Sequence, residues 1–210
     1  MTFDILIAGV GGQGTVLASK LIAAAAIKCG FDARTTETIG MAQRGGSVTG
    51  HTRIGDNIHS PMIRLGGADL LIAFEPAEAV RQLPFLSQGG TLVVFDVAVR
   101  PAAGASKENA APGNDAQSIG RHLKDGYDAD EMIGYIRANV PKHIIVPGMQ
   151  IKQRYAKMIN TALLGAAARS GLFPFGAEIL KETISEMPRF RDENLAAFEL
   201  GGELTDVPAR

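Results

Sequence analysis

Residues 3 to 14 read Phe3-Asp4-Ile5-Leu6-Ile7-Ala8-Gly9-Val10-Gly11-Gly12-Gln13-Gly14, and this stretch decides the fold. Its apolar start is typical of a buried β-strand, and the alanine-rich residues 15–29 that follow contain no glycine or proline. The order is strand, glycine turn, helix. Gly9 would permit the tight turn, Gly11 the close approach of a phosphate, and Gly14 the packing of the helix near the strand. We therefore expect N–H groups at the helix start to face an anion.

The composition restricts the possible functions. The chain has 210 residues, of which 46% are hydrophobic, which is enough for one large domain with its own core. A net charge of -1 leaves no basic surface, so we expect no nucleic-acid partner. A single cysteine, Cys29, excludes an internal disulfide and cannot supply the ligands of a zinc site or an iron–sulfur cluster. We interpret Cys29 as a small buried residue at a helix end and not as a nucleophile.

The ends and the overall organisation give further expectations. The chain begins at once with a strand and contains no apolar run as long as a membrane span, so we expect a cytoplasmic protein without membrane contact. We predict one domain over residues 1–202, followed by a frayed tail at 203–210. Residues 101–119 are rich in Ala, Gly, Pro, Ser and Asn and are predicted to be a loop or mobile segment.

A second glycine-rich stretch follows the second predicted strand, residues 31–38. It reads Thr38-Ile39-Gly40-Met41-Ala42-Gln43-Arg44-Gly45-Gly46-Ser47. It combines backbone donors with a guanidinium, Arg44, that can bind carboxylate or phosphate with two hydrogen bonds. The carboxyl edge of a sheet would place this loop beside the first glycine turn, so the two would line one crevice. The alternative is a flexible loop that leads into a hairpin.

Three side chains near this region have two interpretations each. Glu37 could hold the ribose of a nucleotide, although a solvated carboxylate at a strand end is the favoured interpretation. Residues 47–54 and 60–65 are predicted to form a β-hairpin around Gly55-Asp56-Asn57. His51 and His59 are interpreted as surface residues of that hairpin, and we assign no metal site.

The remaining pattern predicts an α/β fold. Strands are expected at 69–74, 90–97 and 142–146, and helices at 77–83, 128–139, 150–170, 176–187 and 192–201. Glu75 follows a buried strand directly, where it could face a ligand or simply begin the next helix. Together these elements predict a Rossmann-like three-layer fold with a mostly parallel sheet, an inserted β-hairpin and a helical C-terminal part.

The two glycine motifs together resemble the gamma-type subunit of the thiamine-diphosphate-dependent 2-oxoacid:ferredoxin oxidoreductases. Within that family the chain is most similar to the small, beta subunit of indolepyruvate ferredoxin oxidoreductases. Further similar stretches lie at residues 67–76, 160–165 and 194–201, so the resemblance covers nearly the whole chain. Residues 101–119 agree least.

The resemblance implies a subunit of an enzyme that oxidatively decarboxylates a 2-oxoacid, indolepyruvate or another aryl pyruvate, to an acyl-CoA and passes the electrons to ferredoxin. It implies that this chain alone is inactive and holds no cofactor. Coenzyme A is the co-substrate, while thiamine diphosphate, magnesium and 4Fe–4S clusters belong to a large partner subunit. Without that partner, the exposed contact surface could pair two copies as a homodimer.

The resemblance also assigns roles to residues in both motifs. Those expected to line the shared cleft are Gln43, Arg44 and Ser47. Those expected to bind a phosphate-bearing cofactor are Gly9, Gly11, Gly12, Gln13, Gly14, Gly45 and Gly46. Two alternatives remain open from the residues alone: a separate NAD- or flavin-binding Rossmann oxidoreductase, and a purely structural subunit whose glycine motif is only a packing turn.

Overall fold

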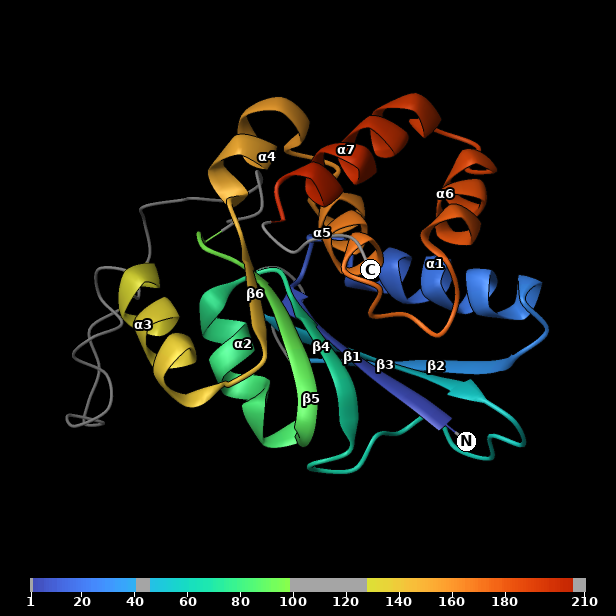
Figure 1. Ribbon diagram of the computed structural model, residues 1–210, viewed down its shortest axis with the longest axis horizontal. Coiled ribbons are helices and arrows are strands. Elements are labelled where there is room, and N and C mark those ends of the chain that lie inside the picture. The colour runs from blue at the N-terminus through green and yellow to red at the C-terminus, as the bar shows by residue number, and fades with distance from the viewer. Residues whose placement is uncertain (1, 41–45, 99–127, 206–210) are drawn as a thin grey trace.

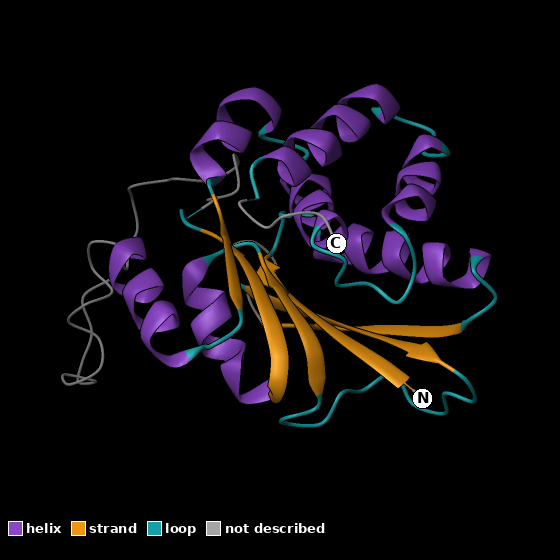
Figure 2. Ribbon diagram, viewed as in Figure 1, coloured by secondary structure: helices purple, strands orange, loops and turns teal. Residues whose placement is uncertain are grey.

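The computed structural model describes residues 2–40, 46–98 and 128–205 (Figure 1). Within these ranges a six-stranded sheet has the order β2-β3-β1-β4-β5-β6. The strands are β1 (Thr2–Val10), β2 (Asp32–Ile39), β3 (Ser47–Gly55), β4 (Ala68–Ala73), β5 (Leu86–Phe95) and β6 (His143–Val146). The sheet forms the middle layer, with helices on both faces (Figure 2).

The alternating side chains of the strands explain the three layers. In β1, Ile5 and Ile7 belong to one core, whereas Leu6 and Ala8 belong to the core on the opposite face. The first core lies under α1 (Thr15–Lys28), α4 (Gly148–Tyr155), α5 (Ile159–Arg169), α6 (Ala177–Ser185) and α7 (Arg191–Glu203). The second lies under α2 (Pro76–Gln82), the short 3-10 helix η1 (Leu83–Phe85) and α3 (Ala129–Asn139).

The predicted fold class is confirmed. Strands β1, β4, β5 and β6 are parallel, and β3 is antiparallel to both of its neighbours, β1 and β2. Because β2 and β1 both oppose β3, only β3 among these six strands is reversed. The Asp128 side chain accepts a hydrogen bond from the Asp130 N–H and so caps α3, as expected for a helix that begins there.

The predicted hairpin partner is wrong. Residues 60–65 form no strand, and β3 pairs instead with β2 and, over its whole length, with β1. Pro61 lacks the N–H group that a ladder position needs. The segment after β3 instead covers the sheet, where Ile58 and Ile63 are each 3% exposed.

Two smaller expectations are also wrong. The single helix predicted at residues 150–170 is two helices, α4 and α5, separated at 156–158, because the Met158 N–H bonds back to the Tyr155 carbonyl and a new helix begins. Cys29 is exposed and not buried, since the last buried residue of α1 is Ala26. The segment 101–119 and residues 206–210 of the predicted tail lie outside the described residues.

Helices α5 and α7 approach each other unusually closely. A Cβ atom on Gly165 of α5 would overlap the carbonyl oxygen of Phe198 in α7. A Cβ on Gly201 of α7 would equally overlap the carbonyl oxygen of Ala162 in α5. These glycines belong to the two C-terminal stretches, 160–165 and 194–201, that are part of the family resemblance. The structure therefore gives those stretches a packing role.

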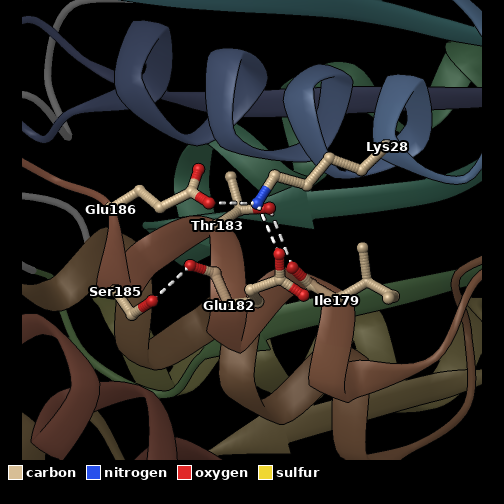
Figure 3. Close-up of polar contacts among 6 residues, drawn as sticks. All are labelled: Lys28, Ile179, Glu182, Thr183, Ser185 and Glu186. Carbon is tan, nitrogen blue, oxygen red and sulfur yellow. Dashed lines mark hydrogen bonds and ion pairs between the residues drawn. The ribbon is translucent and has the colours of Figure 1, made fainter.

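Helix α1 is tied to the C-terminal helices by one ion-pair cluster (Figure 3). Lys28, at the end of α1, lies 2.9 Å from Glu182 and 2.6 Å from Glu186, both on α6. Both carboxylates are more than half exposed, so water and salt screen the attraction.

Candidate functional site

The first glycine turn leaves β1 at the carboxyl edge of the sheet. Gly12 and Gly14 have φ of 101° and 83°, a backbone region that favours glycine. Gly9 is required for space, because a Cβ there would lie 2.7 Å from Gln13 Oε1 and 2.9 Å from the Phe74 ring. At Gly14 the neighbour is Asn160 of α5, whose Nδ2 would lie 2.6 Å from an added Cβ. The third glycine therefore makes room for α5 as well as for its own helix.

The two glycine segments meet. The Gly11 N–H donates to the Gly46 carbonyl at 2.9 Å, and Val10 lies opposite Ser47 in the β1–β3 ladder. The sequence placed the two segments at one sheet edge, and the structure brings the described parts of both together there. Gln43, Arg44 and Gly45 lie outside the described residues.

Two of the backbone donors expected to bind an anion are used inside the protein. The Gly11 N–H goes to Gly46, and the Gln13 N–H donates to the Val10 carbonyl at 3.1 Å. Within the described part of the chain, the N–H groups of Gly12 and Gly14 have no protein acceptor. These two, with the first turn of α1, are the donors that an approaching anion would meet.

The Gln13 side chain is buried behind the turn, with 4% of its surface exposed. Its Oε1 accepts the Val10 N–H at 2.8 Å, and its Nε2 donates to Glu75 Oε1 at 2.7 Å. Glu75 is 5% exposed and directly precedes α2. Its side chain does not cap that helix, so the structure does not favour the interpretation of Glu75 as a simple helix-start acid.

Ser47, the first residue of β3, is held in a similar way. Its hydroxyl donates to Glu78 Oε2 at 2.6 Å, and Glu78 also accepts from Arg81, one turn further along α2. Glu78 is 3% exposed. Glu78 was not predicted from the sequence. The available signal was its position in the first turn of a helix that begins directly after Glu75.

His51 is a correction to the sequence analysis. It is 2% exposed, its Nδ1 accepts the Ile63 N–H at 3.3 Å, and its ring packs edge-to-face on Phe85. Burial lowers the pKa of His51 below its ordinary value, because the charged form loses hydration. His59, in contrast, is exposed as predicted.

His51 lines a groove of about 390 Å³ that begins at the second glycine segment. The groove is lined by Thr38, Gly40, Ser47, Thr49, His51, Met62, Gln82 and Phe85.

Glu37, in the neighbouring strand β2, is half-buried and lies opposite Gly50 in the ladder.

The described residues include no group of three or more His, Cys, Asp or Glu side chains placed to hold a metal ion. Among the described helices, none has both the length and the apolar character needed to cross a bilayer.

A Rossmann-like sheet whose carboxyl edge carries two hydrogen-bonded glycine segments defines an α/β protein of the doubly wound type. The model of the pyruvate ferredoxin/flavodoxin oxidoreductase family matches residues 4–204, and the chain belongs to this family. The resemblance inferred from the glycine motifs is thereby confirmed, and the chain is a subunit of an oxidoreductase of the 2-oxoacid:ferredoxin type.

Characterised relatives are similar over almost the whole chain. The indolepyruvate oxidoreductase subunit IorB of Archaeoglobus fulgidus is 35% identical over 205 residues, which cover 96% of this chain and 94% of the relative. IorB of Pyrococcus horikoshii is 34% identical over 201 residues, covering 95% and 94%. A 2-oxoglutarate synthase subunit, KorC of Methanothermobacter thermautotrophicus, is 26% identical over 209 residues, covering 96% and 94%.

Solved structures share the fold. The pyruvate oxidoreductase subunit PORC of Thermotoga maritima superposes with a TM-score of 0.64 at 21% identity, covering 97% of both chains. The 2-oxoglutarate:ferredoxin oxidoreductase of Magnetococcus marinus superposes with the same TM-score at 20% identity. All of this chain then matches 32% of that longer chain.

Proposed function

We propose that this chain is the small, cluster-free subunit of an indolepyruvate or other aryl-pyruvate ferredoxin oxidoreductase. The complex would oxidatively decarboxylate the 2-oxoacid to an acyl-CoA and pass the electrons to ferredoxin. This chain would be inactive alone and would form one wall of an active site shared with a large partner subunit. We place the complex in the cytoplasm.

The hydrogen bond between Gly11 and Gly46 is the observation that carries this proposal. It joins two motifs that lie 35 positions apart and makes them one surface at the sheet edge. An independent NAD-binding Rossmann site would need only the first motif. The similarity to IorB subunits, at 33–35% identity over most of the chain, favours indolepyruvate as the substrate.

The cofactors would belong to the partner. The single cysteine, Cys29, cannot ligate a 4Fe–4S cluster, so the clusters are assigned to the large subunit together with thiamine diphosphate and magnesium. Thiamine diphosphate would supply the decarboxylation chemistry. Coenzyme A enters as a co-substrate, in line with the coenzyme A bound in the Magnetococcus marinus enzyme.

We assign the roles of the first glycine turn by asking which backbone N–H groups have no acceptor among the described residues. Gly12, Gly14 and the first turn of α1 are proposed to bind a phosphate, whereas Gly9, Gly11 and Gln13 shape the turn. Two buried carboxylates, Glu75 and Glu78, lie behind the segments, where they accept hydrogen bonds from Gln13 and Ser47. For the second segment we propose that Gln43, Arg44 and Ser47, with Gly45 and Gly46, line the cleft.

The test is reconstitution. Co-expression with the large subunit should give a complex that reduces a dye when supplied with indolepyruvate, and acyl-CoA should form only when coenzyme A is present. A complex that prefers pyruvate or 2-oxoglutarate would contradict the substrate proposal. Calorimetric titration of the isolated chain with NADH addresses the alternative, since tight NADH binding would favour a stand-alone Rossmann oxidoreductase. Size-exclusion chromatography of the isolated chain tests for the homodimer.

Arg44 provides the sharpest residue test. If its guanidinium binds a phosphate or carboxylate with two parallel hydrogen bonds, Arg44→Lys should lower turnover of the reconstituted complex by about tenfold or more, because an ammonium cannot replace the planar fork. Arg154→Lys, at an exposed position of α4, is the matched control and should be unaffected. Wild-type turnover in Arg44→Lys would refute the role.

A further inference from the structure

We propose that Glu75 and Glu78 of the α2 region are positioning residues that hold the two glycine segments in register with each other. The inference rests on the proposed function, because it concerns the same cleft. Two buried carboxylates that belong to neither glycine motif would fix the geometry of this cleft through their hydrogen bonds to Gln13 and Ser47.

The first link runs through the Gln13 amide. Its oxygen accepts the Val10 N–H at the end of β1, and its nitrogen donates to Glu75 Oε1. These two bonds use opposite ends of the amide, so together they fix its orientation. Because Gln13 and Glu75 are at least 95% buried, no water competes for either bond. The turn is thereby tied to the residue that begins α2.

The second link runs through Ser47. Its hydroxyl donates to Glu78, and the residue before it, Gly46, accepts the Gly11 N–H. Ser47 thus ties the second segment to α2 at the point where that segment touches the first. Arg81 also binds Glu78 and balances its charge.

Helix α2 is suited to act as the common support. Glu75 directly precedes the first residue of α2, and Glu78 lies in the first turn of that helix. Between the helix and the sheet, Ala79 is fully buried with Ala8 and Ala73, and its N–H bonds to the Glu75 carbonyl. A support packed in this way cannot shift without disturbing the core. Each carboxylate therefore fixes one glycine segment relative to α2.

The decisive experiment exchanges the Gln13–Glu75 pair. In Gln13→Glu the two carboxylates face each other where a 2.7 Å hydrogen bond lay, so turnover of the reconstituted complex should fall about 100-fold. In the double variant Gln13→Glu/Glu75→Gln, the new carboxylate can accept both the Val10 N–H and the amide at position 75. Its turnover should return to within about tenfold of wild type. A double variant as inactive as Gln13→Glu would overturn the proposal.

The Ser47–Glu78 link supplies the second test, which does not depend on whether Gln13→Glu folds. Ser47→Ala should raise the KM for coenzyme A at least about fivefold while the thermal midpoint stays within a few degrees of wild type. Ser47→Thr, which keeps the hydroxyl, should restore the KM. A change in the thermal midpoint without a change in KM would mean a structural role only and would overturn the positioning role. Glu182→Gln, at an exposed site on α6, is the matched control.

One measurement separates this inference from the proposed function. Hydrogen exchange at the Val10 amide can be followed in the isolated chain, without any partner or substrate. It should accelerate in Gln13→Glu and slow again in the double variant. If the wild-type complex oxidises no 2-oxoacid, the proposed function fails while this exchange pattern still holds. If wild type is active and Val10 is equally protected in all three proteins, the positioning inference fails.

Discussion

The glycine segments at the sheet edge and the α5–α7 helix pair both use glycine, but for different physical reasons. At the sheet edge the glycines lie beside buried polar side chains. Gln13, Glu75 and Glu78 each form a hydrogen bond there. Between α5 and α7, Gly165 and Gly201 lie against backbone carbonyls of the facing helix. The first region leaves the N–H groups of Gly12 and Gly14 without an acceptor among the described residues. The second only brings two helices together.

Asn160 connects the two regions. It lies in the first turn of α5, is 3% exposed, and its Nδ2 donates to the Gly14 carbonyl at 3.4 Å. Its neighbour Thr161 donates to Asn194 of α7 at 3.0 Å. The placement of the glycine turn therefore depends on helices that lie far from it in the sequence.

The largest effect is expected in the helix pair. Gly165→Ala and Gly201→Ala should each lower the free energy of unfolding by about 3 kcal/mol or more, because the backbone of the facing helix must move away. Urea unfolding measures this. Gly134→Ala in α3 is the matched control, since a Cβ there meets nothing within 4 Å and should raise stability by about 0.5–1 kcal/mol. Equal stabilities for Gly165→Ala and Gly134→Ala would disprove the close contact.

A second variant pair separates backbone strain from crowding at the turn. Gly14 and Gly30 have nearly the same φ, 83° and 84°, but only Gly14 has a close neighbour, Asn160. Both alanine variants carry the same left-handed strain of about 1 kcal/mol. Gly14→Ala should lose about 1 kcal/mol more in urea unfolding. Adding Asn160→Ala to each variant in a double-mutant cycle should reduce the difference in the free energy of unfolding between Gly14→Ala and Gly30→Ala. An unchanged difference would argue against the contact between Gly14 and Asn160.

The third prediction concerns His51 and pH. Burial lowers its pKa in the folded state, so folding favours the neutral ring. The stability linked to His51 is complete above the unfolded pKa, about 6.5, and is lost as the pH falls from there to the folded pKa. For this single group, the free energy of unfolding cannot change by more than about 1.4 kcal/mol per pH unit. Urea unfolding between pH 7.5 and 5 should show this loss in wild type and in His59→Asn but not in His51→Asn.

The smallest effect is expected where α1 meets α6. The hydrogen bonds that Lys28 donates to Glu186 and Glu182 raise the pKa of Lys28 above its ordinary value. The contribution of the Lys28 ion pairs to the free energy of unfolding is therefore complete below pH 10.5 and is lost as the pH rises through the pKa of Lys28 in the folded state. Lys28→Met should destabilise the protein slightly at pH 7, less than Gly165→Ala, Gly201→Ala or Gly14→Ala, and this loss of stability should vanish in 1 M salt. Thermal melts at low and high salt measure it, and a difference that salt leaves unchanged would point to lost packing.

Several parts of the fold could be predicted because their signals are local. Residues 3–14 specify a strand and a turn through apolar character and glycine spacing, and the alanines after them specify a helix. The meeting of the two glycine segments also followed from a general rule about sheet edges. Other predictions failed where contacts between distant residues decided the outcome. In the sequence, the residues two positions away from His51, Thr49 and Arg53, are polar, as expected for a surface-facing side chain. In the structure, the segment that carries Ile63 covers His51.

The sequence by itself determined the class of fold, the position of both glycine motifs and the family, because strand, turn and helix signals lie within a few residues of one another. Only the tertiary structure decided that β3 pairs with β1 and β2, and that Gln13 meets Glu75 across 62 positions. Such pairings depend on which faces are buried together, and local spacing contains no information about that. For the same reason, only the folded chain places Glu75 and Glu78 behind the glycine segments.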